Sequence, residues 1–126
     1  MNNFIYYLDT SIIHSGKLGD LKIAVKDLVE FVNLKESRLI SYNIYFNEEA
    51  SHMSFLQIHP DSASLEFHLE LGGPIFLKFK DLIELLTIQI YGEATDKLIR
   101  QLNEKAMLLG NAKVTVNNFQ SGFSRF

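Results

Sequence analysis

The sequence predicts an α+β domain of the ferredoxin-like class, in which helices cover one face of an antiparallel sheet. Short β-rich segments alternate with longer segments whose apolar residues recur every three or four positions. In chain order they read β-α-β-β-α-β-α-β, which contains the split pattern β-α-β-β-α-β. At 126 residues the chain has the usual size of one domain, so we treat residues 1–126 as a single unit.

Aromatic and β-branched residues between polar turns mark the strands. We expect strands over residues 4–13, 38–46, 52–59, 85–91 and 113–119. The polar turn at residues 47–51 joins the second and third strands into a hairpin. Pro60 ends the third strand, because proline has no backbone N–H to donate.

Apolar spacing and end signals mark the first and last helices. Residues 20–36 form an amphipathic segment with Asp20 as the expected N-cap. Thr95 is the expected cap of a helix that runs to Leu109 and stops at Gly110, a residue that favours helix ends.

The middle helix has a break signal inside it. It starts at Asp61 or Ser62 and runs to about Leu71, where Gly72-Gly73-Pro74 predicts a break before a further helical piece over residues 75–84. At the other end of the chain, residues 120–126 are either a loose tail or an arm that reaches across a dimer.

Composition excludes several function classes. Without cysteine there is no disulfide, iron–sulfur cluster, thiolate zinc site or cysteine nucleophile. A net charge of -3 leaves no basic stripe for nucleic acid. The most apolar stretch, residues 82–90, contains Glu84 and Gln89, and the N-terminus lacks the features of a secretory signal. We therefore expect no membrane segment and a cytoplasmic protein.

Each expected strand has one aliphatic row and one row that mixes aromatics with amides and hydroxyls. We expect the aliphatic rows to lie under the helices. The mixed rows carry few charges, and they contain Asn43, Tyr45, Phe55, Gln57 and Tyr91. One interpretation is a solvated sheet that lacks charge. The other is a homodimer whose sheets pack face to face and enclose a polar and aromatic cavity for a small molecule.

Three segments resemble a known family. They are Gly16-Lys17 before an amphipathic helix, Tyr42-Asn43-Ile44-Tyr45-Phe46-Asn47-Glu48-Glu49, and Asp61-Ser62-Ala63-Ser64-Leu65-Glu66-Phe67-His68-Leu69 with an alanine five residues before a histidine. In these features, which span about residues 5–92, the chain resembles the antibiotic biosynthesis monooxygenase family. That resemblance implies a dimeric α/β barrel with ferredoxin-like subunits.

The resemblance also implies chemistry. Family members oxidise planar aromatic or quinol-type molecules without metal or flavin, and His68 would be the general base. His59 stands where many catalytic members have a tryptophan, and this chain has no tryptophan. Asp9 stands where the haem-degrading branch has an asparagine. These departures leave open a non-catalytic dimeric binding or stress-response module, and haem binding through His68.

For the enzyme, the expected roles are as follows. His68 removes a proton, and His59 makes a polar contact beside it. Asn43 and Gln57 hold polar substrate groups, while Tyr45, Phe55 and Tyr91 offer stacking surface. The histidine spacing fits no zinc signature, so we expect no metal. The structural alternative for both histidines is a hydrogen-bonded residue at the edge of the core.

Overall fold

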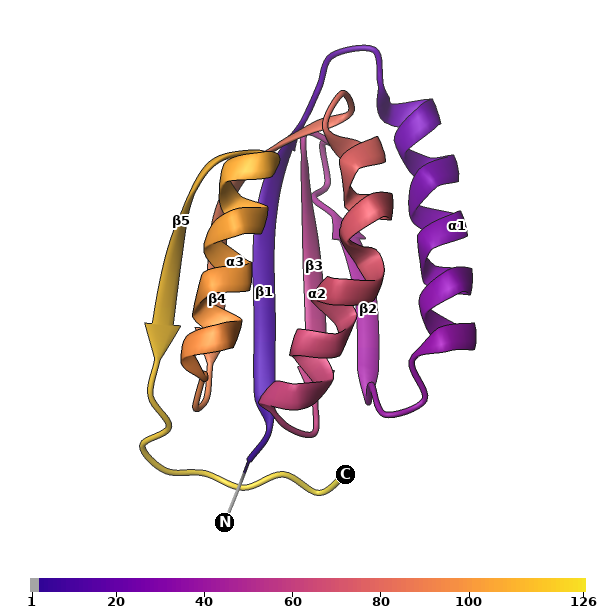
Figure 1. The fold of residues 1–126 in the computed structure, drawn as a ribbon. Helices are drawn as coiled ribbons and strands as arrows, with labels where there is room; N and C mark the ends of the chain where they lie inside the picture. Colours follow the sequence, from indigo (N-terminus) through magenta and orange to yellow (C-terminus); the bar gives the residue numbers. More distant parts are fainter. Residues whose placement is uncertain (1–2) are drawn as a thin grey trace.

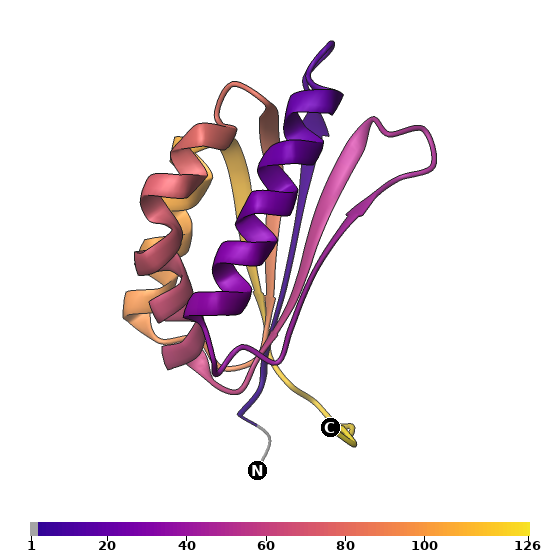
Figure 2. The same ribbon diagram turned by 90° about the vertical axis from the view of Figure 1, so that its right-hand side faces the viewer.

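A computed structural model describes residues 3–126, and in it three α-helices cover one face of a five-stranded sheet (Figures 1 and 2). In chain order the elements are β1 (Ile5–Ile13), α1 (Leu18–Lys35), β2 (Ser41–Phe46), β3 (His52–His59), α2 (Ser62–Phe76), the short 3₁₀ helix η1 (Leu77–Phe79), β4 (Ile83–Tyr91), α3 (Asp96–Leu108) and β5 (Gly110–Asn117). The ferredoxin-like α+β class is confirmed.

The sheet consists of a ferredoxin-like unit and one added strand. The strand order is β2-β3-β1-β4-β5. β1 pairs antiparallel with both β3 and β4, and β2 pairs antiparallel with β3. β5 lies parallel to β4, and α3 connects the two strands. The segment α3–β5 is therefore a crossover added at the β4 edge.

The helix ends follow the predictions in two cases and depart from them in a third. The Asp61 side chain accepts a hydrogen bond from the Ser64 N–H, and Thr95 caps α3 in the same way. α1 begins two residues earlier than predicted, so Asp20 lies in its first turn and Lys17 is the N-cap.

The predicted break at residues 72–74 is wrong, because α2 runs through it to Phe76. Glycine suits this stretch in two ways. A Cβ at residue 72 would lie 2.6 Å from Cζ of Phe76, so glycine there leaves room for that ring. Gly73 has no Cβ to clash with the ring of Pro74. In place of the separate helical piece predicted over residues 75–84, the structure has the end of α2, then η1, and then the start of β4.

The predicted direction of the strand faces is wrong for β1 and β3. The rows that face the helices are Tyr7, Asp9 and Ser11 on β1, and Met53, Phe55, Gln57 and His59 on β3, and all are buried. The rows that face away include Leu8 and Ile12 on β1 and Leu56 and Ile58 on β3. On β4 a bulge opposite β1 turns Leu85 rather than Leu86 toward the helices. Because side chains alternate, one buried polar residue that finds a partner orients its whole strand.

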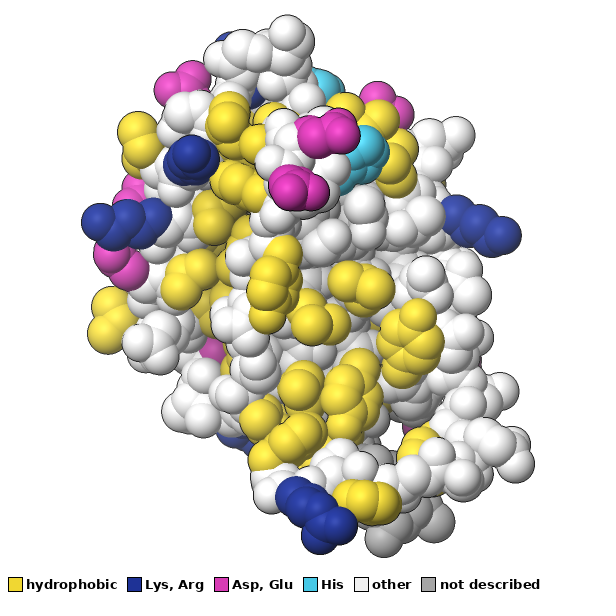
Figure 3. Space-filling model, turned by 180° about the vertical axis from the view of Figure 1, so that it is seen from behind, with side chains coloured by type: hydrophobic (Ala, Val, Ile, Leu, Met, Phe, Trp, Pro, Cys, Tyr) yellow, Lys and Arg dark blue, Asp and Glu magenta, His cyan; other side chains and the backbone are white. Residues whose placement is uncertain are grey.

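The opposite face of the sheet, which we call the open face, lacks helices (Figure 2). Its outward rows include Leu8, Asn43, Tyr45, Leu56, Ile58 and Tyr91. In Figure 3, hydrophobic and uncharged polar side chains occupy most of this face, and charged side chains lie mainly toward its rim. No helix within residues 3–126 is both long enough and apolar enough to span a bilayer.

The start of β5 gives a test of the crossover geometry. A Cβ at Gly110 would lie 2.6 Å from the backbone oxygen of Leu85, whereas a Cβ at Gly19 in α1 meets nothing within 4 Å. We expect Gly110→Ala to lower the free energy of unfolding by about 1–3 kcal/mol through overpacking. Gly19→Ala should raise it by up to about 1 kcal/mol through helix propensity. Urea denaturation measures both, and equal effects of the two substitutions would contradict the close approach.

Candidate active site

Polar side chains are concentrated beneath the helices, between α2, α3 and the centre of the sheet. We call this set the buried polar layer: Tyr7, Asp9, Glu36, Gln57, His59, Ser64, His68 and Lys105, each of them buried. Charged side chains are rarely buried unless they are paired, and burying them unpaired is costly. The partners in this layer therefore decide what it does.

Glu36 and His68 form a buried dyad. The Nδ1 atom of His68 lies 2.6 Å from Oε2 of Glu36, and both side chains are almost fully inaccessible. Since an ionised carboxylate only accepts hydrogen bonds, Nδ1 carries the proton and Nε2 is a free acceptor. Burial lowers the pKa of His68, and Glu36 opposes this effect. The dyad thus presents a neutral imidazole nitrogen.

His59 is held by two hydrogen bonds next to this dyad. Its Nε2 lies 2.8 Å from Oε1 of Gln57, and its Nδ1 lies 2.8 Å from Oγ of Ser64. Burial and then the neighbouring His68 lower the pKa of His59 to about 3. The two histidine rings are 5.8 Å apart between centroids. The structure therefore brings together the two residues predicted as catalytic, although their roles stay predictions.

A second polar group links α3 to β1. The Tyr7 hydroxyl donates to Oδ2 of Asp9 at 2.5 Å, and Nζ of Lys105 donates to the Tyr7 hydroxyl at 2.7 Å. Nζ also lies 3.5 Å from Oδ2 of Asp9. Burial raises the pKa of Asp9 and lowers that of Lys105, and each is partly offset by the other's charge. The result is a short hydrogen-bonded chain from ammonium to phenol to carboxyl group.

Aromatic rings join the two polar groups. Phe76 packs against His68 with ring centroids 5.6 Å apart, and Nζ of Lys105 lies 4.3 Å from the centroid of the same Phe76 ring. Tyr42 contacts His68 at 5.3 Å and Phe55 at 5.8 Å, again between centroids. The dyad and the Lys105 group are thus neighbours across a layer of rings.

Several buried polar atoms of this layer and its rim have no hydrogen-bond partner within residues 3–126. They are Asp9 Oδ1, Ser11 Oγ, Glu36 Oε1, Tyr42 OH, Gln57 Nε2 and His68 Nε2. Buried polar groups are hydrogen-bonded in the large majority of cases. A concentration of free donors and acceptors beside the fixed histidine pair is what a site for a polar ligand requires.

Three hollows adjoin the layer, and one of them, of about 360 Å³ between α2 and α3, is lined by Phe76 and Lys105. An inner cavity of about 20 Å³ lies beside Asp9, Ser11 and Lys105. An outer pocket of about 390 Å³ lies where α1 ends, and residues 35–39, Ser64 and Phe67 line it. Glu36 and Ser64, the partners of His68 and His59, lie in its wall, whereas the two histidines do not line it. Its volume is within the range of small-molecule sites.

Three predicted contact residues lie elsewhere. Asn43 and Tyr45 are exposed on β2, and Tyr91 is exposed on β4, where its hydroxyl donates to Gln89. All three belong to the open face, on the other side of the sheet from the histidines. The predicted single cavity between two sheets therefore does not combine them with Phe55 and Gln57, because β3 turns its mixed row toward the helices.

Sequence reasoning missed the roles of Tyr7, Glu36 and Lys105, yet a signal for two of them was present. Lys105 stands in the apolar stripe of α3, seven residues after Leu98. Glu36 directly follows α1, four residues after the buried Val32. A charged residue at a core position of an amphipathic helix marks a buried polar contact. Within residues 3–126 no three His, Cys, Asp or Glu side chains are arranged to hold a metal ion.

Comparison with known proteins tests the resemblance. No family model matches the sequence, and no curated protein matches it. Among solved structures, MupZ from Pseudomonas fluorescens is similar with a TM-score of 0.76 and 16% identity, covering 98% of this chain and 96% of its own. SnoaB from Streptomyces nogalater, a cofactor-independent oxygenase, has a TM-score of 0.62 at 8% identity, covering 74% of this chain and 95% of its own.

A third structure, provisionally assigned as an antibiotic biosynthesis monooxygenase from Deinococcus radiodurans, has a TM-score of 0.61 at 17% identity. It covers 73% of this chain and 96% of its own. The chain has the antibiotic biosynthesis monooxygenase-like fold. This fold accounts for most of the chain in each comparison, and the MupZ match takes in nearly all of it, including the crossover α3–β5.

Protonation of His59 gives a test of the buried layer. Its pKa of about 3 in the folded protein lies below the usual 6.5, so the unfolded chain binds more protons between these values. The stability that neutral His59 contributes is complete above pH 6.5 and is lost as the pH falls toward 3. The slope should approach about 1.4 kcal/mol per pH unit. We expect the stability difference between wild type and His59→Gln in urea to shrink from pH 7 to pH 4, and a constant difference would contradict the buried state.

Proposed function

We propose that this protein is a small enzyme that removes a proton from a planar phenol or quinol and exposes the resulting anion to O₂, without metal or flavin. The observation that carries the proposal is the buried Glu36–His68 dyad with a free Nε2 atom. The fold, shared with the cofactor-independent oxygenase SnoaB, supports the same reaction class. Because fold alone does not fix function, the dyad is the stronger argument.

The dyad has the parts that general base catalysis needs. The proton leaves a substrate O–H or acidic C–H and goes to Nε2 of His68, where the lowered pKa keeps the imidazole neutral beforehand. The imidazolium that forms is stabilised by the carboxylate of Glu36 at 2.6 Å. Electrons from the substrate anion then reduce O₂, so one oxygen atom enters the substrate and the other leaves as water.

The surroundings suit a flat, partly polar molecule. The outer pocket is large enough for a ring system, and it ends at Glu36 and Ser64. Gln57, Phe55 and Tyr42 lie deeper than this pocket, so a substrate that passes Glu36 and Ser64 would meet the free Nε2 of Gln57 as a donor and the rings of Phe55 and Tyr42. In this proposal His59 positions Gln57 and Ser64 rather than transferring protons, because both of its nitrogens are already occupied.

We propose further that the protein is a homodimer that associates through the open face. Leu56, Tyr45 and Tyr91 are 39%, 53% and 39% exposed there, and the middle of the face has few charges (Figure 3). Depletion of charge and enrichment of tyrosine are typical of interface cores. Asn43, Tyr45 and Tyr91 would then contact the partner subunit, with the substrate site remaining within each subunit.

Haem ligation through His68 is less well supported. The free Nε2 belongs to a ring that Tyr42, His59 and Phe76 surround at 5.3–5.8 Å between centroids. Any ligand must move part of this ring cluster to reach that nitrogen, and a haem, which is much larger than a quinol, would have to displace all three side chains. A non-catalytic binding module remains the outcome if ligands bind and no turnover occurs.

A substitution of the base tests the proposed reaction. We expect His68→Gln, whose amide can still donate to Glu36, to lower turnover by about 10²–10⁴-fold. The matched control is His14→Gln, because His14 lies outside the layer and its ring hydrogen-bonds to the Asp81 carbonyl. An oxygen electrode measures O₂ uptake with 1,4-naphthalenediol in the presence of superoxide dismutase and catalase. Equal rates for the two variants would remove His68 from the mechanism.

A charge on the open face tests the dimer. We expect wild type to sediment as a dimer at micromolar concentration, and Leu56→Glu to sediment as a monomer because the charge would be buried unpaired. Leu34→Glu, on the exposed side of α1, is the matched control and should remain dimeric. A monomeric wild type, or a dimer that tolerates Leu56→Glu, would contradict the proposed interface.

A further inference from the structure

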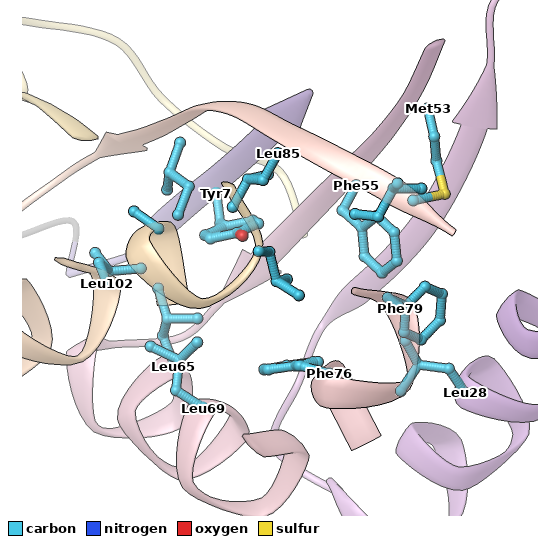
Figure 4. Close-up of a cluster of buried hydrophobic side chains, with 14 of the residues drawn as sticks. Tyr7, Leu28, Met53, Phe55, Leu65, Leu69, Phe76, Phe79, Leu85 and Leu102 are labelled. Atoms are coloured by element: carbon cyan, nitrogen blue, oxygen red, sulfur yellow. The ribbon is translucent and has the colours of Figure 1, made fainter. Parts of the chain in front are cut away.

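The inner cavity is small, lined mainly by apolar side chains, and bordered by the Lys105–Asp9 ion pair and the Ser11 hydroxyl. Its volume is about 20 Å³, which is slightly more than one water molecule needs. Apart from Asp9, Ser11 and Lys105, its lining consists of Leu28, Met53, Phe55, Phe76, Phe79, Ile83, Leu85 and Leu109. Figure 4 shows several of these side chains converging from the sheet, α1 and the end of α2.

The size and lining of this cavity match a diatomic apolar molecule. A phenol or quinol needs several times this volume, so the proposed substrate does not fit inside. Apolar cavities in proteins accept small apolar guests such as xenon. Dioxygen is the small apolar reactant that the proposed reaction consumes.

Two charged side chains border the cavity, Asp9 and Lys105, and of the two only Lys105 attracts an anion formed inside it. One of the three N–H donors of Lys105 goes to Tyr7, and another faces Asp9 at 3.5 Å. The third has no polar partner within residues 3–126. An ammonium gains little from neutral O₂ and much from an anion formed beside it in a medium of low dielectric constant.

We propose that the inner cavity is the dioxygen site of the protein and that Lys105 stabilises the superoxide formed in it. This inference rests on the proposed function for its electron donor. One electron passes from the deprotonated substrate to O₂, which gives a substrate radical and superoxide. The superoxide then passes the ring of Phe76 and forms a C–O bond with the substrate radical beside His68, and the resulting peroxide anion takes a proton from the His68 imidazolium. The proton that His68 removed from the substrate balances this uptake.

The geometry places the two halves of the reaction side by side. Phe76 contacts His68 on one side and Lys105 on the other. The substrate anion at His68 and the gas in the cavity are thus separated by about one aromatic ring. Because Lys105 interacts with the reduced oxygen and not with O₂ itself, its contribution belongs to the transition state and not to binding.

Kinetics with O₂ as the varied substrate test the role of Lys105. We expect Lys105→Met to lower kcat/KM for O₂ by about 10²–10³-fold. The KM for 1,4-naphthalenediol should stay the same, since that molecule binds elsewhere. Lys113→Met, on the exposed side of β5, is the control and should match wild type. The double variant Asp9→Asn/Lys105→Met removes both charges together. It therefore measures the loss of kcat/KM for O₂ without leaving the Asp9 carboxylate buried and unpaired.

Gas binding tests the cavity without any turnover. Under several bar of O₂, we expect paramagnetic relaxation of the methyl groups of Met53 and Leu85, at the cavity, to exceed that of Leu65, which is equally buried but does not line it. Ser11→Thr adds one methyl group to the cavity and should abolish the excess relaxation of Met53 and Leu85 over Leu65.

The outcomes separate the two proposals. Excess relaxation without any quinol oxidation would refute the proposed function and leave the O₂ site standing. Quinol oxidation with no excess relaxation, or with kcat/KM for O₂ unchanged in both Lys105 variants, would overturn the O₂ site alone.

Discussion

The hydrogen-bonded chain from Lys105 through Tyr7 to Asp9 is the constraint on which the rest of the structure depends. It joins the added helix α3 to the central strand of the sheet, and it can form only if β1 turns its polar row toward the helices. With that choice made, alternation sends Tyr6, Leu8, Thr10 and Ile12 of β1 to the open face. One buried contact thereby explains both a polar interior and an apolar exterior face.

The same reasoning extends to β3 and α2. Gln57 and His59 face inward because Ser64 and His68 on α2 meet them there. Glu36, directly after α1, completes the second polar group. The interior thus has a base on one side and a cation on the other, with Phe76 between them. Such a division suits a reaction that takes a proton from one molecule and gives an electron to another.

Local signals in the sequence predicted the order of the elements and the caps at Asp61 and Thr95, since these depend on near neighbours along the chain. The histidine pair could be predicted because a strand end and the helix that follows it lie close together. The inward direction of the mixed rows could not, because it depends on Lys105 and Glu36, far away in sequence. The continuous α2 likewise depends on how Phe76 packs against Gly72.

Removal of the substrate proton by His68 is the central claim, and anaerobic spectroscopy tests it most directly. Without O₂ the deprotonated substrate accumulates, and ionised naphthols absorb at longer wavelength than neutral ones. At pH 7, wild type mixed with 1,4-naphthalenediol should show this red shift, and His68→Gln should show the spectrum of the neutral diol. A wild-type spectrum without the shift, or the same shift in both proteins, would contradict the account.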